Sequence, residues 1–302
     1  MADAATALVE VEDLYKQFRS ADGRKVHAVE AVSLAVGRGE TLAVVGESGC
    51  GKSTLAYLVM RLLEPTAGTI RLGGADITHL KRKAMRPHRQ RMQIIFQDPF
   101  ASLDPRRQIG AAIAEPMVVH GIGDKQSREQ KVISLLETVG LERSHMRQFP
   151  HQFSGGQRQR ICIARALALE PELVVADEAV SALDVSIQAQ VINLMMDLQD
   201  ELGLSYLFIS HDLAVVERIS HRVAVMYLGQ IVELGPRAAI FENPRHEYTQ
   251  TLLSAVPIAD PTKRRERPMF SGEVPSPVYG PGESPQRVHL EEVGPGHFVA
   301  VS

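Results

Sequence analysis

Hydrophobic residues over the first 65 positions follow a strand-like pattern and then a helical one. Two β-rich runs, Val26–Val36 and Thr41–Val45, are separated by the polar turn Gly37-Arg38-Gly39, which predicts that a sheet begins here. After Gly51 the apolar residues recur at helical spacing as far as Pro65, where proline is expected to stop the helix. The apolar positions of this predicted helix are Leu55, Leu58, Val59, Leu62 and Leu63.

The next stretch changes from strands to helices. Residues 68–78 predict a hairpin and residues 93–96 another strand, after which the pattern is mainly helical from about 99 to 170. One amphipathic helix lies in the middle of that region, and a second begins at Ser154 and ends before Pro171. The apolar face of the first of these helices consists of Val132, Leu135, Leu136 and Val139.

Two later runs, Leu173–Ala176 and Tyr206–Ile209, are apolar without alternation, as in strands buried on both faces of a parallel sheet. Residues 187–202 between them have a helical pattern. We therefore expect an α/β fold with an N-terminal antiparallel β subdomain, a parallel-sheet core and an inserted helical subdomain over about 99–170.

The C-terminal part of the chain has a different composition. From about residue 236 prolines become frequent, and residues 275–285 read PSPVYGPGESP. This pattern predicts a partly ordered appendage. The expected division is a main domain over 1–235 and an extension over 236–302.

Charge and cysteine content narrow the function classes. A net charge of -3 gives no global attraction to nucleic acid, and the basic run over 81–91 lacks interleaved aromatic residues, so a solvated face is expected there. The only cysteines, Cys50 and Cys162, cannot form a metal cluster alone and fit a reducing cytosol. We expect a soluble chain, because the start has no signal-peptide pattern and no run of 18 apolar residues occurs.

Residues 46–54, GESGCGKST, match GxxxxGK[ST] and lie between a predicted strand and a predicted helix, where this phosphate-binding motif must lie. The glycines let backbone N–H groups converge on phosphates, and the helix N-terminus adds its positive end. Lys52 is expected to reach the β- and γ-phosphates, and Ser53 to bind Mg²⁺. The candidate nucleotide-binding residues of this segment, here called the phosphate loop, are Gly46, Ser48, Gly49, Gly51, Lys52, Ser53 and Thr54.

An apolar strand, residues 173–178 with the sequence LVVADE, ends in two acids. In proteins with a phosphate loop, a carboxylate at such a strand end meets the metal. Asp177 is therefore the candidate Mg²⁺ residue. Glu178 lies one residue further toward the γ-phosphate, where it can orient or deprotonate the attacking water, so it is the candidate general base.

Residues 153–160, FSGGQRQR, resemble the signature sequence of ABC ATPases. Ser154 is expected to cap a helix whose first amides belong to Gly155 and Gly156, which makes a second anion site. An ordinary capped helix would explain the serine but not the destabilising glycine pair. With Gln157, these residues form the SGGQ segment and are candidate nucleotide-binding residues.

The other motifs of that family follow in the same order. Gln97 in IIFQDP resembles the Q-loop glutamine, which contacts Mg²⁺ or the lytic water. Asp184 in SALD resembles the D-loop, and His211 in ISHD resembles the switch histidine, which contacts the γ-phosphate. The segment DLYKQF resembles the A-loop, whose aromatic residue stacks on adenine, and its spacing favours Phe18 over Tyr15. The resemblance thus implies ATP and Mg²⁺ as ligands.

The stretches QDPFASLDPR, DEAVSALDVSIQAQV and ENPRHEYTQTLLSAVP resemble ATPases of dipeptide, oligopeptide and nickel importers, particularly their second ATPase subunit. The resemblance implies a homologous or identical ATPase in a head-to-tail dimer, two membrane permease subunits, and indirectly an extracytoplasmic substrate-binding protein. The chain would then act at the cytoplasmic face of a membrane. Two further stretches, VGPGHFVA and ERISHRVAVMYLGQIVE, resemble the second ATPase half of glutathione importers. Residues 236–302 lack cysteine, so no iron–sulfur cluster is expected.

Several alternatives compete with a peptide importer. An ABC ATPase of DNA repair or translation would carry long coiled-coil insertions or two cassettes, and a GTPase would carry an NKxD or TKxD element; neither is present. A nickel importer and an exporter have the same ATPase motifs.

The SGGQ segment lies in the predicted helical insertion. We therefore expect it to complete the nucleotide site at the phosphate loop of a facing chain.

Overall fold

The computed structural model describes residues 7–19, 24–254, 278–279 and 285–301. The chain divides into two compact units, residues 1–79 with 207–302 (unit 1) and residues 80–206 (unit 2).

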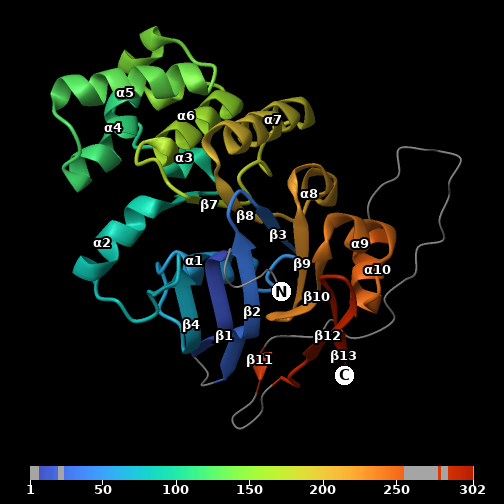
Figure 1. The fold of residues 1–302 in the computed structure, drawn as a ribbon. Helices are drawn as coiled ribbons and strands as arrows, with labels where there is room; N and C mark the ends of the chain where they lie inside the picture. The colour runs from blue at the N-terminus through green and yellow to red at the C-terminus, as the bar shows by residue number, and fades with distance from the viewer. Residues whose placement is uncertain (1–6, 20–23, 255–277, 280–284, 302) are drawn as a thin grey trace, which may run out of the picture. The chain divides into compact units, whose positions relative to one another are not determined.

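The first sheet of unit 1 is antiparallel and is built around the N-terminal strand. β1 (Ala7–Arg19) pairs with β2 (Lys25–Gly37) on one side and with β4 (Ala67–Leu72) on the other, as Figure 1 shows in blue and cyan. The short strands β5 (Ala75–Asp76) and β11 (Val278–Tyr279) form its two edges. The predicted antiparallel subdomain and the hairpin over 68–78 are therefore confirmed.

The second sheet of unit 1 contains the strand that leads into the phosphate loop. β3 (Thr41–Val45) is buried throughout and lies between β9 (Arg222–Tyr227), its parallel partner, and β8 (Ser205–Ile209). β10 (Gln230–Pro236) pairs antiparallel with β9. The parallel pairing of fully buried strands explains their unbroken apolar sequences.

The helix after the phosphate loop, α1 (Lys52–Val59), is shorter than predicted. Arg61 adopts a φ of +51°, and a left-handed residue ends the helical path. The amides of Leu62 and Leu63 both turn back to the carbonyl of Tyr57. Thus the backbone conformation at Arg61, and not Pro65, determines where the helix ends.

The described part of the C-terminal region contains regular elements that the sequence pattern did not reveal. Two short helices, α9 (Arg237–Glu242) and α10 (Glu247–Ser254), follow β10. β12 (His289–Gly294) and β13 (His297–Val301) form a hairpin whose second strand pairs with β10. Most of the proline-rich stretch over 275–285 lies outside the described residues.

Unit 2 is mainly helical. Its two strands, β6 (Met92–Ile95) and β7 (Leu173–Asp177), pair in parallel, one residue earlier for β6 than predicted. The helix α6 (Gly155–Leu167) packs against α3 (Pro99–Ser102), α4 (Ile109–His120) and α5 (Lys125–Thr138), which Figure 1 shows gathered around it in green and cyan. The other helices are α2 (Arg82–Arg91) and α7 (Val185–Leu202), with 3₁₀ turns at Arg143–Arg147 and Pro150–Gln152.

In α2, which carries the basic run, only Met85 is buried, as expected for a solvated face. Among the helices of the described ranges, none combines the length and the apolarity that crossing a bilayer requires.

Candidate functional site

The phosphate loop follows β3 and has a backbone that only glycine accommodates at two positions. Gly46 has a φ of +150° and Gly51 a φ of +111°. A Cβ atom would lie 2.2 Å from the Met226 carbonyl oxygen at Gly46, and 2.1 Å from the Ala28 carbonyl oxygen at Gly51. The loop is therefore pressed against strands β9 and β2, and a side chain at either glycine would push it away.

Lys52 lies at the first position of α1 and is only 4% exposed. Its Nζ donates hydrogen bonds to the carbonyl oxygens of Gly46, at 2.8 Å, and of Glu47, at 2.7 Å. The ammonium group is thus held over the loop by neutral acceptors. Both acceptors are uncharged carbonyl oxygens, so they do not neutralise the buried ammonium group. A phosphate bound at the loop would supply that negative charge.

The first turn of α1 presents Ser53 and Thr54 next to Lys52. Gly51 is the N-cap and no side chain caps the helix, so the positive end of its dipole points into the loop. Within the described ranges, no group of three or more His, Cys, Asp or Glu side chains could hold a metal. A Mg²⁺ site composed of one hydroxyl, one carboxylate, phosphate oxygens and water needs no such group.

The loop cysteine, Cys50, is buried within this turn. Burial raises the pKa of its thiol, although the nearby Lys52 charge opposes the shift. The neutral thiol lies 3.9 Å from the Lys52 Nζ. A buried protonated thiol packs within the loop and is a poor nucleophile.

In unit 2, the two acids at the end of β7 have different environments. Asp177 is the last residue of the strand and is 3% exposed. Glu178 has a φ of +48°, and its carboxylate Oε2 accepts a hydrogen bond of 2.8 Å from Gln97 Nε2. Gln97 lies just beyond β6, the parallel neighbour of β7. Two candidate catalytic residues from distant sequence positions are therefore in direct contact.

The SGGQ segment forms the N-terminus of α6 as predicted. The Ser154 hydroxyl accepts a hydrogen bond from the Gln157 amide, and the Gln157 side chain accepts one from the Ser154 amide, which completes a capping box. Gly155 and Gly156 lie in the first turn, where an α-helix leaves its N–H groups without intrahelical partners. This arrangement is suited to binding an anion.

The remaining predicted residues lie at ends or edges of elements. Asp184 is exposed and is the N-cap of α7. His211 is exposed and follows β8, just before the cap of α8 (Leu213–Ile219). Phe18 is 38% exposed in β1, whereas Tyr15 is half-buried in the same strand. Phe18 is thus the more accessible of the two aromatic residues.

Unit 1 contains the phosphate loop, Phe18 and His211, and unit 2 contains Gln97, the SGGQ segment, Asp177, Glu178 and Asp184.

The phosphate loop has a contact to the C-terminal extension that the sequence does not predict. The hydroxyl of Tyr248 in α10 accepts a hydrogen bond of 3.1 Å from the Glu47 amide. The motif ENPRHEYTQTLL contains this tyrosine, but nothing in the motif indicates a partner two hundred positions away.

Comparison with known families gives two matches along the chain. Residues 29–181 match the family described as ABC transporter. Residues 232–282 match the family described as oligopeptide/dipeptide transporter, C-terminal region.

Curated relatives include the glutathione import ATP-binding protein GsiA of Pectobacterium atrosepticum, which is 55% identical over 98% of this chain and 49% of its own length. The protein of the same name from Escherichia coli K12 is 57% identical over 92% of this chain and 45% of its own length. The chain thus spans about half the length of these relatives.

Solved structures of similar fold include cbiO1 from Clostridium perfringens, part of the ABC transporter complex cbiONQ, with a TM-score of 0.70 and 27% identity over 79% of this chain and 92% of that one. A dimeric ATP-binding cassette in a post-hydrolysis state with ADP and Pi has a TM-score of 0.69 and 25% identity over 76% of this chain and 98% of that one. These similarities confirm the predicted α/β cassette fold.

Proposed function

Because the chain belongs to the ABC transporter family, we propose that it binds and hydrolyses ATP as a subunit of an importer for peptides. The observation that carries this proposal is the phosphate loop: two glycines pressed against neighbouring strands, with buried Lys52 held above them. In this arrangement a polyphosphate meets converging amides, a helix N-terminus and an ammonium group.

Roles for the site residues follow from their chemistry. Lys52 binds the β- and γ-phosphates, and the amides of the phosphate loop bind the rest of the phosphate chain. Ser53, Asp177 and Gln97 would hold Mg²⁺, which neutralises the phosphate charge when bound. Glu178 accepts the proton of the attacking water, and Gln97, which donates to Glu178, orients that carboxylate. His211 contacts the γ-phosphate and Phe18 stacks on the adenine.

The nucleotide site is proposed to be shared between two chains arranged head to tail. Ser154, Gly155, Gly156 and Gln157 of one chain, with Asp184, would close over the phosphate loop of the other. The support is the SGGQ segment itself, a second helix N-terminus that is capped but carries glycines in its first turn. ATP then holds the two cassettes together, and its hydrolysis releases them.

Peptides, glutathione among them, are the proposed cargo. The support is the match of residues 232–282 to the oligopeptide/dipeptide transporter C-terminal region, together with relatives named for glutathione import. The proposed partners are an identical or homologous ATPase, two permease subunits and, indirectly, a substrate-binding protein. Residues 1–235 would form the nucleotide-binding domain at the cytoplasmic face of the membrane, and residues 236–302 the importer-type extension.

The first test is nucleotide binding by Lys52→Ala, titrated with a fluorescent ATP analogue. Loss of a charged phosphate contact should weaken binding about tenfold or more. Lys131→Ala is the matched control, because this lysine of α5 lies at the surface and pairs with Glu170. Equal affinity in all three proteins would reject the assigned site.

The importer assignment is tested separately, by purification of the tagged chain from detergent-solubilised membranes. Two membrane permease subunits should copurify, and ATP-driven peptide uptake should follow reconstitution. Recovery of the active ATPase with a DNA-repair or translation complex would contradict the transport role.

A further inference from the structure

The hydroxyl of Tyr248 is the contact by which the C-terminal extension reaches the phosphate loop. It accepts a hydrogen bond from the Glu47 amide at 3.1 Å, although the two residues are 201 positions apart. Tyr248 is 5% exposed, and burial raises the pKa of its hydroxyl, which keeps it neutral at physiological pH. A neutral hydroxyl with a fixed partner can restrain a glycine-rich loop.

The Tyr248 ring is held by a second contact to the same region. Its centroid lies 4.2 Å from that of Tyr227, and the two planes are tilted by 36°. Tyr227 is the last residue of β9, directly after Met226, whose carbonyl oxygen limits the space at Gly46. The loop and its tyrosine therefore rest on the same strand end, and the ring position does not depend on the hydroxyl alone.

The start of α10 is fixed by a buried carboxylate. Glu233 of β10 is fully buried and accepts hydrogen bonds from the amides of Arg245, at 2.8 Å, and His246, at 3.0 Å. His297 of β13 contacts the same carboxylate at 2.7 Å through Nε2. A buried carboxylate requires such partners. Through them, Glu233 of β10 links the loop before Tyr248 to the C-terminal hairpin.

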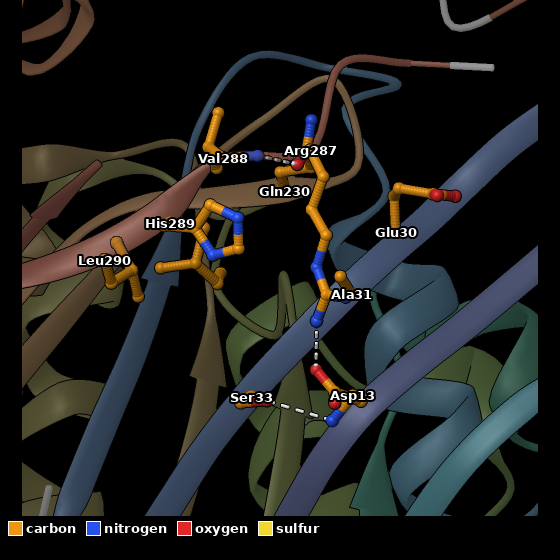
Figure 2. Close-up of a pocket in the computed structure, with 10 residues that line it drawn as sticks. Asp13, Glu30, Ala31, Ser33, Gln230, Arg287, Val288, His289 and Leu290 are labelled. Carbon is orange, nitrogen blue, oxygen red and sulfur yellow. Dashed lines mark hydrogen bonds and ion pairs between the residues drawn. The ribbon is translucent and has the colours of Figure 1, made fainter. Parts of the chain in front are cut away.

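The extension also contacts the first sheet, through strand β11 and through an exposed ion pair. Arg287 reaches across to Asp13 at 2.7 Å, as Figure 2 shows, but both side chains are about half exposed or more. Exposed ion pairs contribute little to stability. The buried tyrosine contact is thus the better candidate for a functional link.

We propose that Tyr248 is a positioning residue, through which the C-terminal extension holds the phosphate loop in the conformation that accepts nucleotide. The inference rests on the proposed function, namely ATP binding at this loop. A loop with left-handed glycines at 46, 49 and 51 has access to many conformations, and only the binding-competent fraction contributes to the apparent affinity. A hydrogen bond from outside the loop increases that fraction.

The deciding variant is Tyr248→Phe, which removes the hydroxyl and keeps the ring on Tyr227. The matched control is Tyr206→Phe, because Tyr206 is also buried and loses a single hydrogen bond, to the Met195 carbonyl in unit 2. Hydrogen exchange of the peptide spanning residues 46–51, measured without nucleotide, reports the loop directly. Affinity for a fluorescent ATP analogue and the KM and kcat of hydrolysis report the consequence.

Tyr248→Phe should speed exchange in the loop and raise Kd and KM about two- to fivefold, the equivalent of one neutral hydrogen bond, with kcat nearly unchanged. Tyr206→Phe should lower thermal stability and leave loop exchange and KM as in wild type. If loop exchange and ATP affinity in Tyr248→Phe equal those of the wild type, the inference is overturned and the proposed function is not. Failure of the wild-type chain to bind ATP would overturn the proposed function, and the inference with it.

Discussion

Glu178 leaves β7 in a left-handed conformation, with a φ of +48°. For a residue with a side chain this costs about 1–2 kcal/mol, so the surrounding structure must impose it. Ser181 contributes to this, because both its amide and its hydroxyl donate to the Glu178 carbonyl oxygen. The strained turn places the carboxylate against Gln97, which would orient it in the proposed role of general base.

At the same scale, Cys162 provides a test of the buried helix face. It is buried in α6, and burial raises the pKa of its thiol to about 11. In a Cys50→Ser background, folded chain should resist iodoacetamide at pH 8 and react readily in urea. Because the folded pKa is raised, this thiol contributes stability below its unfolded pKa of 9.0 and loses it as pH rises through about 11. Rapid labelling of the folded chain would contradict the packing described for α6.

At the scale of elements, the two glycines of the SGGQ segment differ in the space that a side chain would have. A Cβ at Gly156 would lie 2.3 Å from Ile187 Cγ2 in α7, whereas one at Gly155 would lie 3.5 Å from Leu183. Gly156→Ala should therefore lower the free energy of unfolding by about 1–3 kcal/mol through overpacking. Gly155→Ala should be neutral or stabilise by up to about 1 kcal/mol, since alanine favours the helix.

Thermal and urea unfolding of the two alanine variants checks this contrast. Equal midpoints for Gly155→Ala and Gly156→Ala would show that α6 and α7 do not approach closely at Gly156.

Elements were predictable from the sequence where the determining signal is local. The cap at Ser154 and the buried strands β3, β7 and β8 depend on a few consecutive residues, and they lie where the pattern places them. The end of α1 depends on the conformation of Arg61, which no pattern specifies. The hairpin β12–β13 was missed because its pairing with β10 depends on contacts far along the chain.

The same distinction applies to the candidate site. Motif spacing was enough to single out the loop before α1 and the two acids at the end of β7, because each depends on a few consecutive residues. The contact of Tyr248 with Glu47 and the close approach of Gly156 to Ile187 join distant residues, so they required the fold.

At the scale of the whole molecule, the shared-site proposal predicts complementation between two defective chains. Lys52→Ala removes the phosphate contact at the phosphate loop, and Ser154→Arg disrupts the anion site of the SGGQ segment. Each variant alone should therefore neither dimerise with ATP nor hydrolyse it. A mixed dimer rebuilds one complete site from the two intact halves. Mixing should restore part of the ATP-dependent dimerisation, measured by size-exclusion chromatography with light scattering.

Two outcomes of the mixing experiment go against a site shared by identical chains. A mixture as inert as either variant, while wild-type chains dimerise, would reject it. Failure of the wild type to dimerise would assign the second half of the site to a homologous but different ATPase.

The central claim, that this chain hydrolyses ATP with Glu178 as the base, is tested most directly by phosphate release from Glu178→Gln. The amide keeps the shape and can still accept from Gln97, but it cannot take a proton from water. Hydrolysis should fall about 100-fold or more, as expected for loss of a general base, while ATP affinity stays within about twofold of wild type. Near-wild-type phosphate release from Glu178→Gln would contradict the account.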